Sequence, residues 1–515
     1  MMNFIDKAVN FINPKAGLQR ARARTELQIM NYAQHGASKS KDSLIGMNVT
    51  GNSPDYDTTR NIKTLRARSR DLWMGGTAGT AALKTLRTNV IGKGLTCKPQ
   101  IDHEFLGIDH EKARELELAI EREWLLWSES ANCDAERKHN FYTLQRLTFL
   151  SKLMNGDAFV TMPYKERKGS PYTLTVQLIE GDRVTNPIAT EGKDIIEGVE
   201  VKNGEVVAYH IGQTTLFNNY SYGDFVRLEA YGKLTGEKMV LHLFEPERAG
   251  QRRGVPMLSS VIEHVQQLSR YTKAEINRAV LMGVLTAVIT KGENDSNPLD
   301  RIGLSDEEKI TNDKNKIELG QGNFFELEPG EDIKTISGAS NNQLAFEAFF
   351  NAVVTQIGAC LEIPRGILMK SFNASYSASR AELLEFWKVA SCEHSYMSLN
   401  FCQPIYERFL IEAISLGRLD LPGFMDNPLK RKAYSSCKWV GQSKGHLDPL
   451  KEVNAAKAKV DYGFSTIEIE AQEMGNDWDE VQAQRVIEQK MRVEGGLEDA
   501  KQKVLGVQEP SGGNS

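Results

Sequence analysis

Cysteine is scarce in this chain, which has six cysteines in 515 residues and no Cys-x-x-Cys pair. A set this sparse predicts no disulfide framework and favours a reducing compartment. Free cysteines are among the most buried residue types, so we expect these to be small hydrophobic residues of the core.

Long hydrophobic runs are missing as well. The most apolar stretch, residues 279–290, is much shorter than the ~20 residues that a membrane-spanning helix needs. We interpret it as a buried helix that passes into a strand, and we expect no membrane contact. Asp6 and Lys7 interrupt the apolar run at the N-terminus, so this run does not predict a signal peptide.

The sequence has no excess of positive charge. Lys and Arg together number 63 against 68 Asp and Glu, which gives a formal net charge of -5. Proteins that clamp DNA tightly draw their affinity from neutralised phosphates and usually carry a basic excess. The charge balance therefore argues against tight, static binding of a nucleic acid.

Signatures of catalysis are absent too. The sequence contains neither a GxxxxGK[ST] phosphate loop nor a GxSxG nucleophile motif. The Gly-rich stretch at residues 75–81 fits a turn between helices, and His103 and His110 are spaced too widely for a zincin pair. We therefore predict no catalytic, cofactor-binding or metal-binding residues. One enzyme alternative stays open, a serine hydrolase that would need a histidine and a carboxylate near Ser375 or Ser377.

The length of 515 residues suggests roughly two to four domains, and hydrophobic periodicity predicts an α+β protein. Between about residues 157 and 245, Val, Thr, Ile and Tyr follow the pattern of an antiparallel sheet. Elsewhere helical spacing dominates. Helices are expected at 61–92 (two, around the Gly-rich stretch), 110–128, 141–156, 257–283, 344–363 and 380–417, the last with a kink near Pro404, and over most of 418–500.

The stretch KSFNASYSAS, residues 370–379, is small, polar and nearly uncharged, and it separates two helical segments. Ser379 and Glu382 have the spacing of a capping box, so we expect Ser379 to cap the second helix. Three interpretations of the stretch are open: a catalytic serine loop, an ordinary connection between helices, or a loop that touches a ligand without gripping it.

A set of collinear motifs resembles the lambda family of tailed-phage portal proteins. The match runs from about residue 60 to residue 495, and its specificity comes from the common order of the motifs. They include LRARSRDLWMGG (65–76), MNGDAFV (154–160), VQLIEGDRV (176–184), HLFEPERAGQRRGVP (242–256), NASYSASRAELLEFWK (373–388) and DYGFSTIEIEAQEMGNDWDEV (461–481).

The resemblance implies a portal-type fold assembled as a ring, usually of twelve subunits, at one vertex of the capsid. Double-stranded DNA would slide through its channel during packaging and ejection. By this analogy the chain divides into a flexible arm (1–60), a mixed α/β wing (61–256), a first stem helix (257–283), a small β-containing clip (284–343), a second stem helix (344–363), a tunnel loop (364–379), a long kinked wing helix (380–417), a mainly helical crown (418–500) and a disordered tail (501–515).

Two groups of candidate residues follow. The resemblance places DNA-channel residues in the tunnel loop, namely Lys370, Ser371, Phe372, Asn373, Ala374, Ser375 and Tyr376. Guanidinium forks suit the carboxylates of a neighbouring subunit, so Arg248, Arg252 and Arg253 are candidates for contacts between subunits.

The resemblance also implies partners. They are other copies of the chain, double-stranded DNA, the terminase large subunit, the major capsid protein or scaffold, and connector or tail proteins. Without a nucleotide-binding loop, the chain would depend on the terminase ATPase for force. The implied location is the virion, after assembly in the host cytoplasm. The main alternative is another self-assembling head component, which would lack the helix–β–helix–loop–helix order predicted for residues 257–417.

Overall fold

The computed structural model describes residues 11, 13–30, 42–187, 194–213, 224–284, 288–291, 331–334, 342–372, 375–442, 449–474 and 478–495. The chain divides into two compact units, Met1–Asp57 and Thr58–Ser515. Most of the predicted clip and all of the predicted tail lie outside the described residues. The domain limits implied by the resemblance stay predictions.

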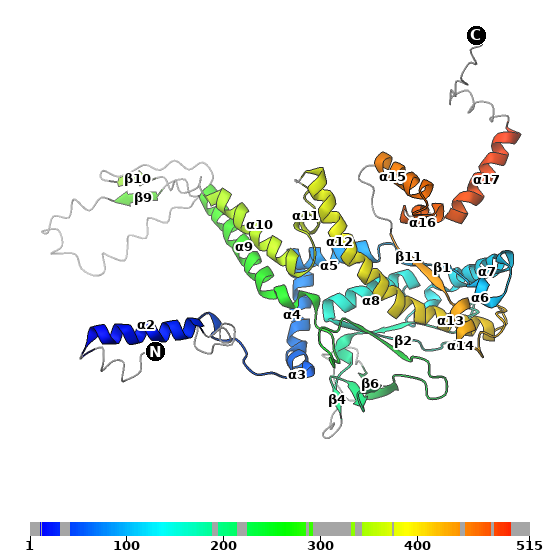
Figure 1. Ribbon diagram of the computed structural model, residues 1–515, viewed down its shortest axis with the longest axis horizontal. Coiled ribbons are helices and arrows are strands. Elements are labelled where there is room, and N and C mark those ends of the chain that lie inside the picture. The colour runs from blue at the N-terminus through cyan, green and yellow to red at the C-terminus, as the bar shows by residue number, and fades with distance from the viewer. Residues whose placement is uncertain are drawn as a thin grey trace, which may run out of the picture. The chain divides into compact units, whose positions relative to one another are not determined.

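The first unit contains helix α2, Pro14–Met30 (Figure 1). The sequence predicted a poorly ordered arm here, so the helix differs from that expectation. Its residues explain the difference, because proline suits the first turn of a helix and Ala, Arg, Leu and Gln, which fill most of the segment, have high helix propensity. A 3-10 turn, Asp42–Leu44, follows in the sequence.

Helices make up much of the second unit, and three predictions are confirmed there. The helix pair around the Gly-rich stretch meets at Gly76, the helix at 110–128 has its predicted limits, and Gly156 ends another helix in the left-handed conformation. These helices are α3 (Pro54–Thr59, which begins in the first unit), α4 (Ile62–Gly75), α5 (Thr77–Val90), α6 (His103–Leu106), α7 (His110–Ser128) and α8 (Phe141–Asn155).

All the strand pairs that the structure describes are antiparallel. The predicted β region is confirmed, and it forms two sheets with strand orders β3-β2-β8 and β4-β5-β6-β7. Two further pairs are β1-β11 and β10-β9. The strands are β1 (Thr96–Pro99), β2 (Asp157–Thr161), β3 (Gln177–Ile179), β4 (Ile195–Ile196), β5 (Val199–Lys202), β6 (Glu205–Gly212), β7 (Phe225–Glu229), β8 (Val240–Phe244), β9 (Val288–Lys291), β10 (Glu331–Lys334) and β11 (Cys437–Val440).

The main hydrophobic core is centred on Trp124 of α7, which is 1% exposed. Its ring meets Phe141 of α8 edge to face, with 5.1 Å between centroids, and Phe409 in the same way at 5.2 Å. It also meets Trp439 of β11 at 5.8 Å. Each such pair contributes about 0.5–1.5 kcal/mol beyond its buried area. The aromatic cluster therefore joins segments that are far apart in the sequence.

Helices α9 (Ile262–Val284) and α10 (Asn342–Cys360) pack against each other (Figure 1). Tyr271 of α9 stacks on Phe346 at 5.5 Å and meets Phe349 edge-on at 4.9 Å. The two helices predicted on either side of the clip are thus present and pack as a hairpin, whereas their role as a stem stays a prediction. The prediction that the apolar stretch at 279–290 passes from helix into strand is also confirmed, since β9 follows α9.

The ends of this hairpin differ from the predicted limits. A 3-10 turn, Met257–Val261, precedes α9, so the α-helix begins five residues later than expected. At the other end α10 stops at Cys360, and Glu362 has a positive φ of 55° that turns the chain out of the helix. Pro364 follows this turn, and the residue before a proline is disfavoured in a helix.

The long helix after the tunnel loop consists of α12 (Tyr376–Met397), a π-helical turn (Ser398–Cys402) and α13 (Gln403–Ser415). The sequence predicted a kink near Pro404, and the irregular turn lies just before this residue. Pro404 occupies the first turn of α13, where a missing N–H is tolerated. The remaining helices are α11 (Arg365–Met369), α14 (Pro428–Tyr434), α15 (Pro449–Asp461), α16 (Ile467–Glu473) and α17 (Trp478–Glu494), which confirm the mainly helical C-terminal region.

Candidate functional site

The tunnel-loop candidates lie between α10 and α12, on a segment shorter than the sequence predicted. The prediction was one loop over residues 364–379. Helix α11 occupies Arg365–Met369, and α12 already begins at Tyr376. Non-helical backbone between these two helices is therefore limited to residues 370–375.

Lys370 ends α11 in the left-handed conformation, with a φ of 52°. Its backbone N–H donates to the carbonyl of Ile367 at 3.3 Å, and the N–H of Ser371 donates to the carbonyl of Gly366 at 3.0 Å. This pair of hydrogen bonds is a common way to close a helix C-terminus. A non-glycine residue in this conformation costs about 1 kcal/mol, which the cap offsets. The ammonium-bearing side chain of Lys370 is exposed.

The other tunnel-loop candidates are only partly described. Ser371 is exposed, and Phe372 exposes 55% of its surface although it is a large apolar residue. Asn373, Ala374 and the side chain of Tyr376 lie outside the described residues. The structure thus brings Lys370, Ser371 and Phe372 together as an exposed turn, and their contact with DNA stays a prediction.

The start of α12 corrects the predicted helix cap. Ser375, four residues before Ser379, is the N-cap, and its Oγ accepts a hydrogen bond from the N–H of Ala378 at 3.4 Å. Ser375 Oγ also lies 3.2 Å from Ser377 Oγ. Within the described residues, no histidine or carboxylate forms a hydrogen bond with either hydroxyl, so the arrangement is that of a helix cap and offers no support for a serine nucleophile.

Glu382, the expected partner in the capping box, has another position. Its carboxylate lies against Gly366 of α11, where any Cβ would collide with it. A substitution at Gly366 would therefore displace the end of the Glu382 side chain. Residues 370–372 thus follow α11, which packs against α10 and α12.

The three arginine candidates lie in the loop that leads to α9, and they occupy different environments. Arg252 pairs with Asp194 at 2.6 Å, and its side chain is 16% exposed. Arg248 is exposed. Arg253, in contrast, is fully buried and directs its donors to groups of its own chain. We therefore no longer propose Arg253 as a contact between subunits, whereas Arg248 and Arg252 stay predictions.

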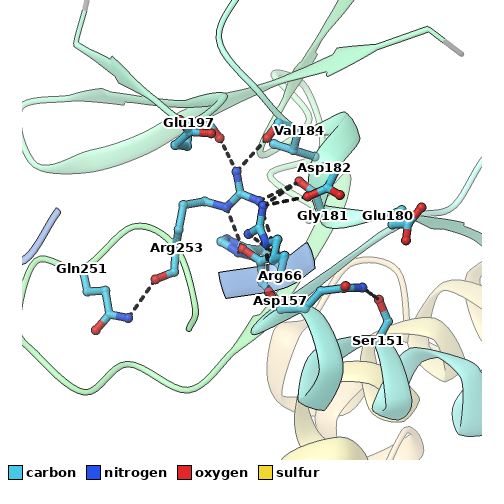
Figure 2. A network of polar contacts seen from close by, with 12 residues as sticks. Arg66, Ser151, Asp157, Glu180, Gly181, Asp182, Val184, Glu197, Gln251 and Arg253 are labelled. Carbon is cyan, nitrogen blue, oxygen red and sulfur yellow. Dashed lines mark hydrogen bonds and ion pairs between the residues drawn. The ribbon is translucent and has the colours of Figure 1, made fainter. Parts of the chain in front are cut away.

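Arg253 belongs to a buried network that also contains Arg66, Asp157 and Asp182, which we call the arginine cluster (Figure 2). Arg253 Nε donates to Asp157 Oδ2 at 2.6 Å, and Arg66 Nη2 donates to Asp157 Oδ1 at 2.9 Å. Arg66 Nη1 reaches Asp182 Oδ1 at 3.4 Å. The carbonyl of Gly181 accepts from both guanidinium groups, at 3.3 Å from Arg66 and 2.8 Å from Arg253.

The charges of the cluster and its rim are balanced. Arg70 pairs with Asp182 at 2.5 Å and with Glu180 at 3.4 Å, so three arginines face three carboxylates. Burial alone would raise the pKa of Asp157, but Arg253 and Arg66 outweigh it and hold this pKa well below its usual range. Burial lowers the pKa of His242, whose Nε2 lies 3.6 Å from Asp157 Oδ2. Asp157 is therefore charged and His242 neutral at pH 7.

The cluster could not be predicted from the sequence, although four of the sequence motifs contain its residues. Arg66 comes from the motif at 65–76, Asp157 from 154–160, Asp182 from 176–184 and Arg253 from 242–256. Four of the stretches that carry the family resemblance thus meet at one point of the fold. No local spacing could reveal this, because Arg253 and Asp157 are 96 residues apart in the chain.

The described part of the chain offers little for other kinds of site. It contains no helix long and apolar enough to cross a membrane and no group of three or more potential metal ligands. Cys97, Cys133 and Cys402 are buried free thiols, as expected, whereas Cys360 and Cys392 are exposed.

Comparisons with known proteins agree with the motifs. The family described as "Phage portal protein, lambda family" matches residues 11–393. The chain is 24% identical over 487 residues to portal protein B of Escherichia phage lambda, covering 90% of each chain. It is 24% identical over 478 residues to the portal protein of Escherichia phage N15, covering 88% of this chain and 89% of that one.

Among solved structures, the chain is similar to a protein in the neck of a native GTA particle computed with C12 symmetry. The identity is 13%, the coverage is 81% of this chain and 94% of that chain, and the TM-score is 0.41. The family match extends over well more than half of the sequence, and two relatives from phages align along almost their whole length. This chain therefore belongs to the lambda family of phage portal proteins, the head–tail connectors of the virion.

Proposed function

We propose that copies of this chain close into a ring, twelve by family analogy, around a channel through which double-stranded DNA is packaged and ejected. Portal proteins are structural components, and this chain has no phosphate loop. The ring therefore provides the path, and a terminase ATPase docked on the clip, residues 284–343, provides the force. Connector or tail proteins later take the place of the terminase.

The observation that carries this proposal is the lack of cations on α10. No Lys or Arg occurs between Lys334 and Arg365, and the only charged residues in that interval are acidic. The exposed side chains of α10 are mostly small or neutral, among them Ala348, Ala352, Thr355, Gln356 and Ala359. DNA carries a charge for every ~1.7 Å of duplex, so a wall without cations does not hold it. We assign this face of α10 to the channel.

Helix α9 has the opposite character. It carries Arg270, Lys273 and Arg278, and Arg278 pairs with Glu275 at 3.6 Å. Ile276 and Val280 lie one helical turn apart and are 58% and 59% exposed. Two exposed apolar residues on one helix face suit a contact with the next subunit, because a closed ring requires each copy to present two different surfaces. We assign this face of α9 to the contact between subunits.

The exposed turn at 370–372 completes the channel. Lys370 is the one basic residue of the stretch 370–379, so each subunit would offer the duplex a single ammonium group at that level. One cation per subunit can position a phosphate backbone, whereas a dense basic surface would arrest it. Contacts with the major capsid protein or scaffold complete the set of proposed partners.

Electron microscopy of the purified full-length chain tests the proposal. End-on views should show annular particles with a central hole, and side views should show a stem. The measurement is negative-stain class averaging over a range of protein concentrations, with size-exclusion chromatography coupled to light scattering as the control for mass. Monodisperse monomers at every concentration would contradict the proposal.

A further inference from the structure

Resting on the proposed ring, we infer that the arginine cluster determines how many subunits close the ring, because it fixes the direction in which α9 leaves the body of the subunit. The cluster lies directly before the stem in the chain. Arg253 is followed by Pro256, the 3-10 turn Met257–Val261 and then α9. A rotation of the backbone at Arg253 would therefore act close to the root of the stem, since α9 begins nine residues later.

Arg253 is held in a fixed orientation because all of its N–H donors are used. Nε and Nη2 bind the carboxylate of Asp157 at 2.6 and 3.3 Å. Nη1 donates to the carbonyl of Val184 at 2.7 Å and to that of Glu197, and Nη2 donates to the carbonyl of Gly181 at 2.8 Å. A guanidinium has five donors in a rigid plane, and the five acceptors here lie on three segments of the chain.

The acceptors of Arg253 lie on separate parts of the body, and Arg253 itself lies in the loop before the stem (Figure 2). Asp157 opens β2, Gly181 and Val184 lie in the turn after β3, and Glu197 lies in the turn between β4 and β5. Arg66 of α4 binds the same carboxylate and also the carbonyl of Asn155 at 2.9 Å. The cluster thus joins the helical body, both larger sheets and the loop that leads to α9.

The loop itself has little freedom around Arg253. Gln251 is 7% exposed, accepts hydrogen bonds from the N–H groups of Glu247 and Arg248 and donates to the carbonyl of Arg253 at 2.7 Å. A Cβ at Gly254 would collide with the carbonyl of Gly156, so the two backbones are in direct contact.

Apolar packing alone would not fix the direction as closely. The first turns of α9 bury Val265 and Leu268 in the main core. Such contacts are non-directional and tolerate small rotations, whereas hydrogen bonds weaken steeply as their angles change. We therefore attribute the angular precision of the stem to the cluster.

Angular precision matters because ring size depends on small angles. Successive subunits are rotated by about 30° in a ring of twelve and by about 28° in a ring of thirteen. The two rotations differ by only about 2°, so a small change in how neighbouring stems meet would separate one ring size from the next. A subunit with a loosened cluster should fold but should close into rings of more than one size.

The test compares Arg253→Lys with Arg122→Lys in the full-length chain. Lysine keeps the charge at position 253 but cannot supply five donors in a plane. Arg122 lies on α7 and is exposed, so the same substitution there is the matched control outside the arginine cluster. The symmetry of rings is counted from end-on class averages and from native mass spectrometry, after circular dichroism and a melting curve have shown that each variant is folded.

We expect one dominant ring size for the wild type and Arg122→Lys, and at least two sizes or open arcs for Arg253→Lys. Hydrogen exchange in residues 247–256 should be faster in Arg253→Lys. Folded Arg253→Lys rings with the wild-type size distribution would overturn the inference. If Arg253→Lys does not fold, ring sizes are counted for Gln251→Ala. This substitution removes hydrogen bonds of the loop without changing a charge, and we expect it to give more than one ring size. Rings of Gln251→Ala with the wild-type size distribution would overturn the inference. Failure of the wild type to form rings would instead contradict the proposed function.

Discussion

Asp157 has the most demanding environment of any single residue in the cluster, since it is a fully buried carboxylate between two buried arginines. Replacing it with asparagine leaves buried cations without their counter-charge, which typically costs about 3–5 kcal/mol. We predict that Asp157→Asn lowers the free energy of unfolding by that amount at pH 7, measured by chemical denaturation. Asp461→Asn, at an exposed position on α15, is the control and should change little.

The same residue predicts a dependence on pH. Its pKa in the folded state lies below the unfolded value of about 4, so its contribution to stability is complete above pH 4 and is lost as the pH falls further. The acid side of the stability curve should therefore be flatter in Asp157→Asn than in the wild type. Equal slopes below pH 4 would show that this carboxylate does not carry the acid sensitivity.

Arg253 shows why sequence reasoning failed at this scale. An arginine in a loop with Gly and Gln is usually solvated or available to a partner, and nothing in its neighbourhood indicates burial. Its main partner is 96 residues away, and its other acceptors are backbone carbonyls, which no sequence pattern marks. Hydrophobic periodicity indicates which side of a single helix or strand is buried, so it cannot predict an ion pair between residues far apart in the sequence.

At the scale of elements, the start of α12 can be tested directly. Ser375 is the observed cap, so Ser375→Ala should lower the free energy of unfolding by about 1 kcal/mol. Ser379 lies within the helix, where alanine has the higher propensity, so Ser379→Ala should be neutral or slightly stabilising. Denaturation curves give the energies, and hydrogen exchange in the first turn of α12 locates the effect. A larger loss for Ser379→Ala would restore the predicted cap.

Most elements were predictable from the sequence because their signals are local. The apolar stripe of α7 predicts the limits of that helix, and the alternation of apolar and polar residues predicts the β region. The predicted cap of α12 was wrong because Glu382 lies against Gly366 and does not complete a capping box, and α12 begins earlier than expected. The irregularity expected near Pro404 is present as the π-helical turn Ser398–Cys402, which ends two residues before the proline.

At the scale of the whole molecule, the proposed channel wall makes a prediction about charge. Thr355 is exposed on α10, so Thr355→Lys would add one cation per subunit to the face assigned to the channel. Rings should still form but should bind a short duplex more tightly and with a steeper salt dependence, by about 0.9 in the log–log slope for each phosphate engaged. Fluorescence anisotropy across a salt series measures this.

The matched control for that substitution is Asn277→Lys, which places the same cation on an exposed position of α9. It should leave DNA binding near the wild-type level. If both substitutions strengthen DNA binding equally, the assignment of the exposed face of α10 to the channel wall is wrong. The family and the order of the elements could be inferred from the sequence, but the channel face could not, because it depends on how copies of the chain meet.

The saturated guanidinium of Arg253 has a mechanical consequence for a protein that must withstand the pressure of a packed genome. Its hydrogen bonds lose most of their strength once the atoms separate by about a further ångström, and they share one rigid plane. We therefore expect the joint to keep its geometry up to a threshold load and then to yield as a unit, so that the proposed stem is stiff and not elastic.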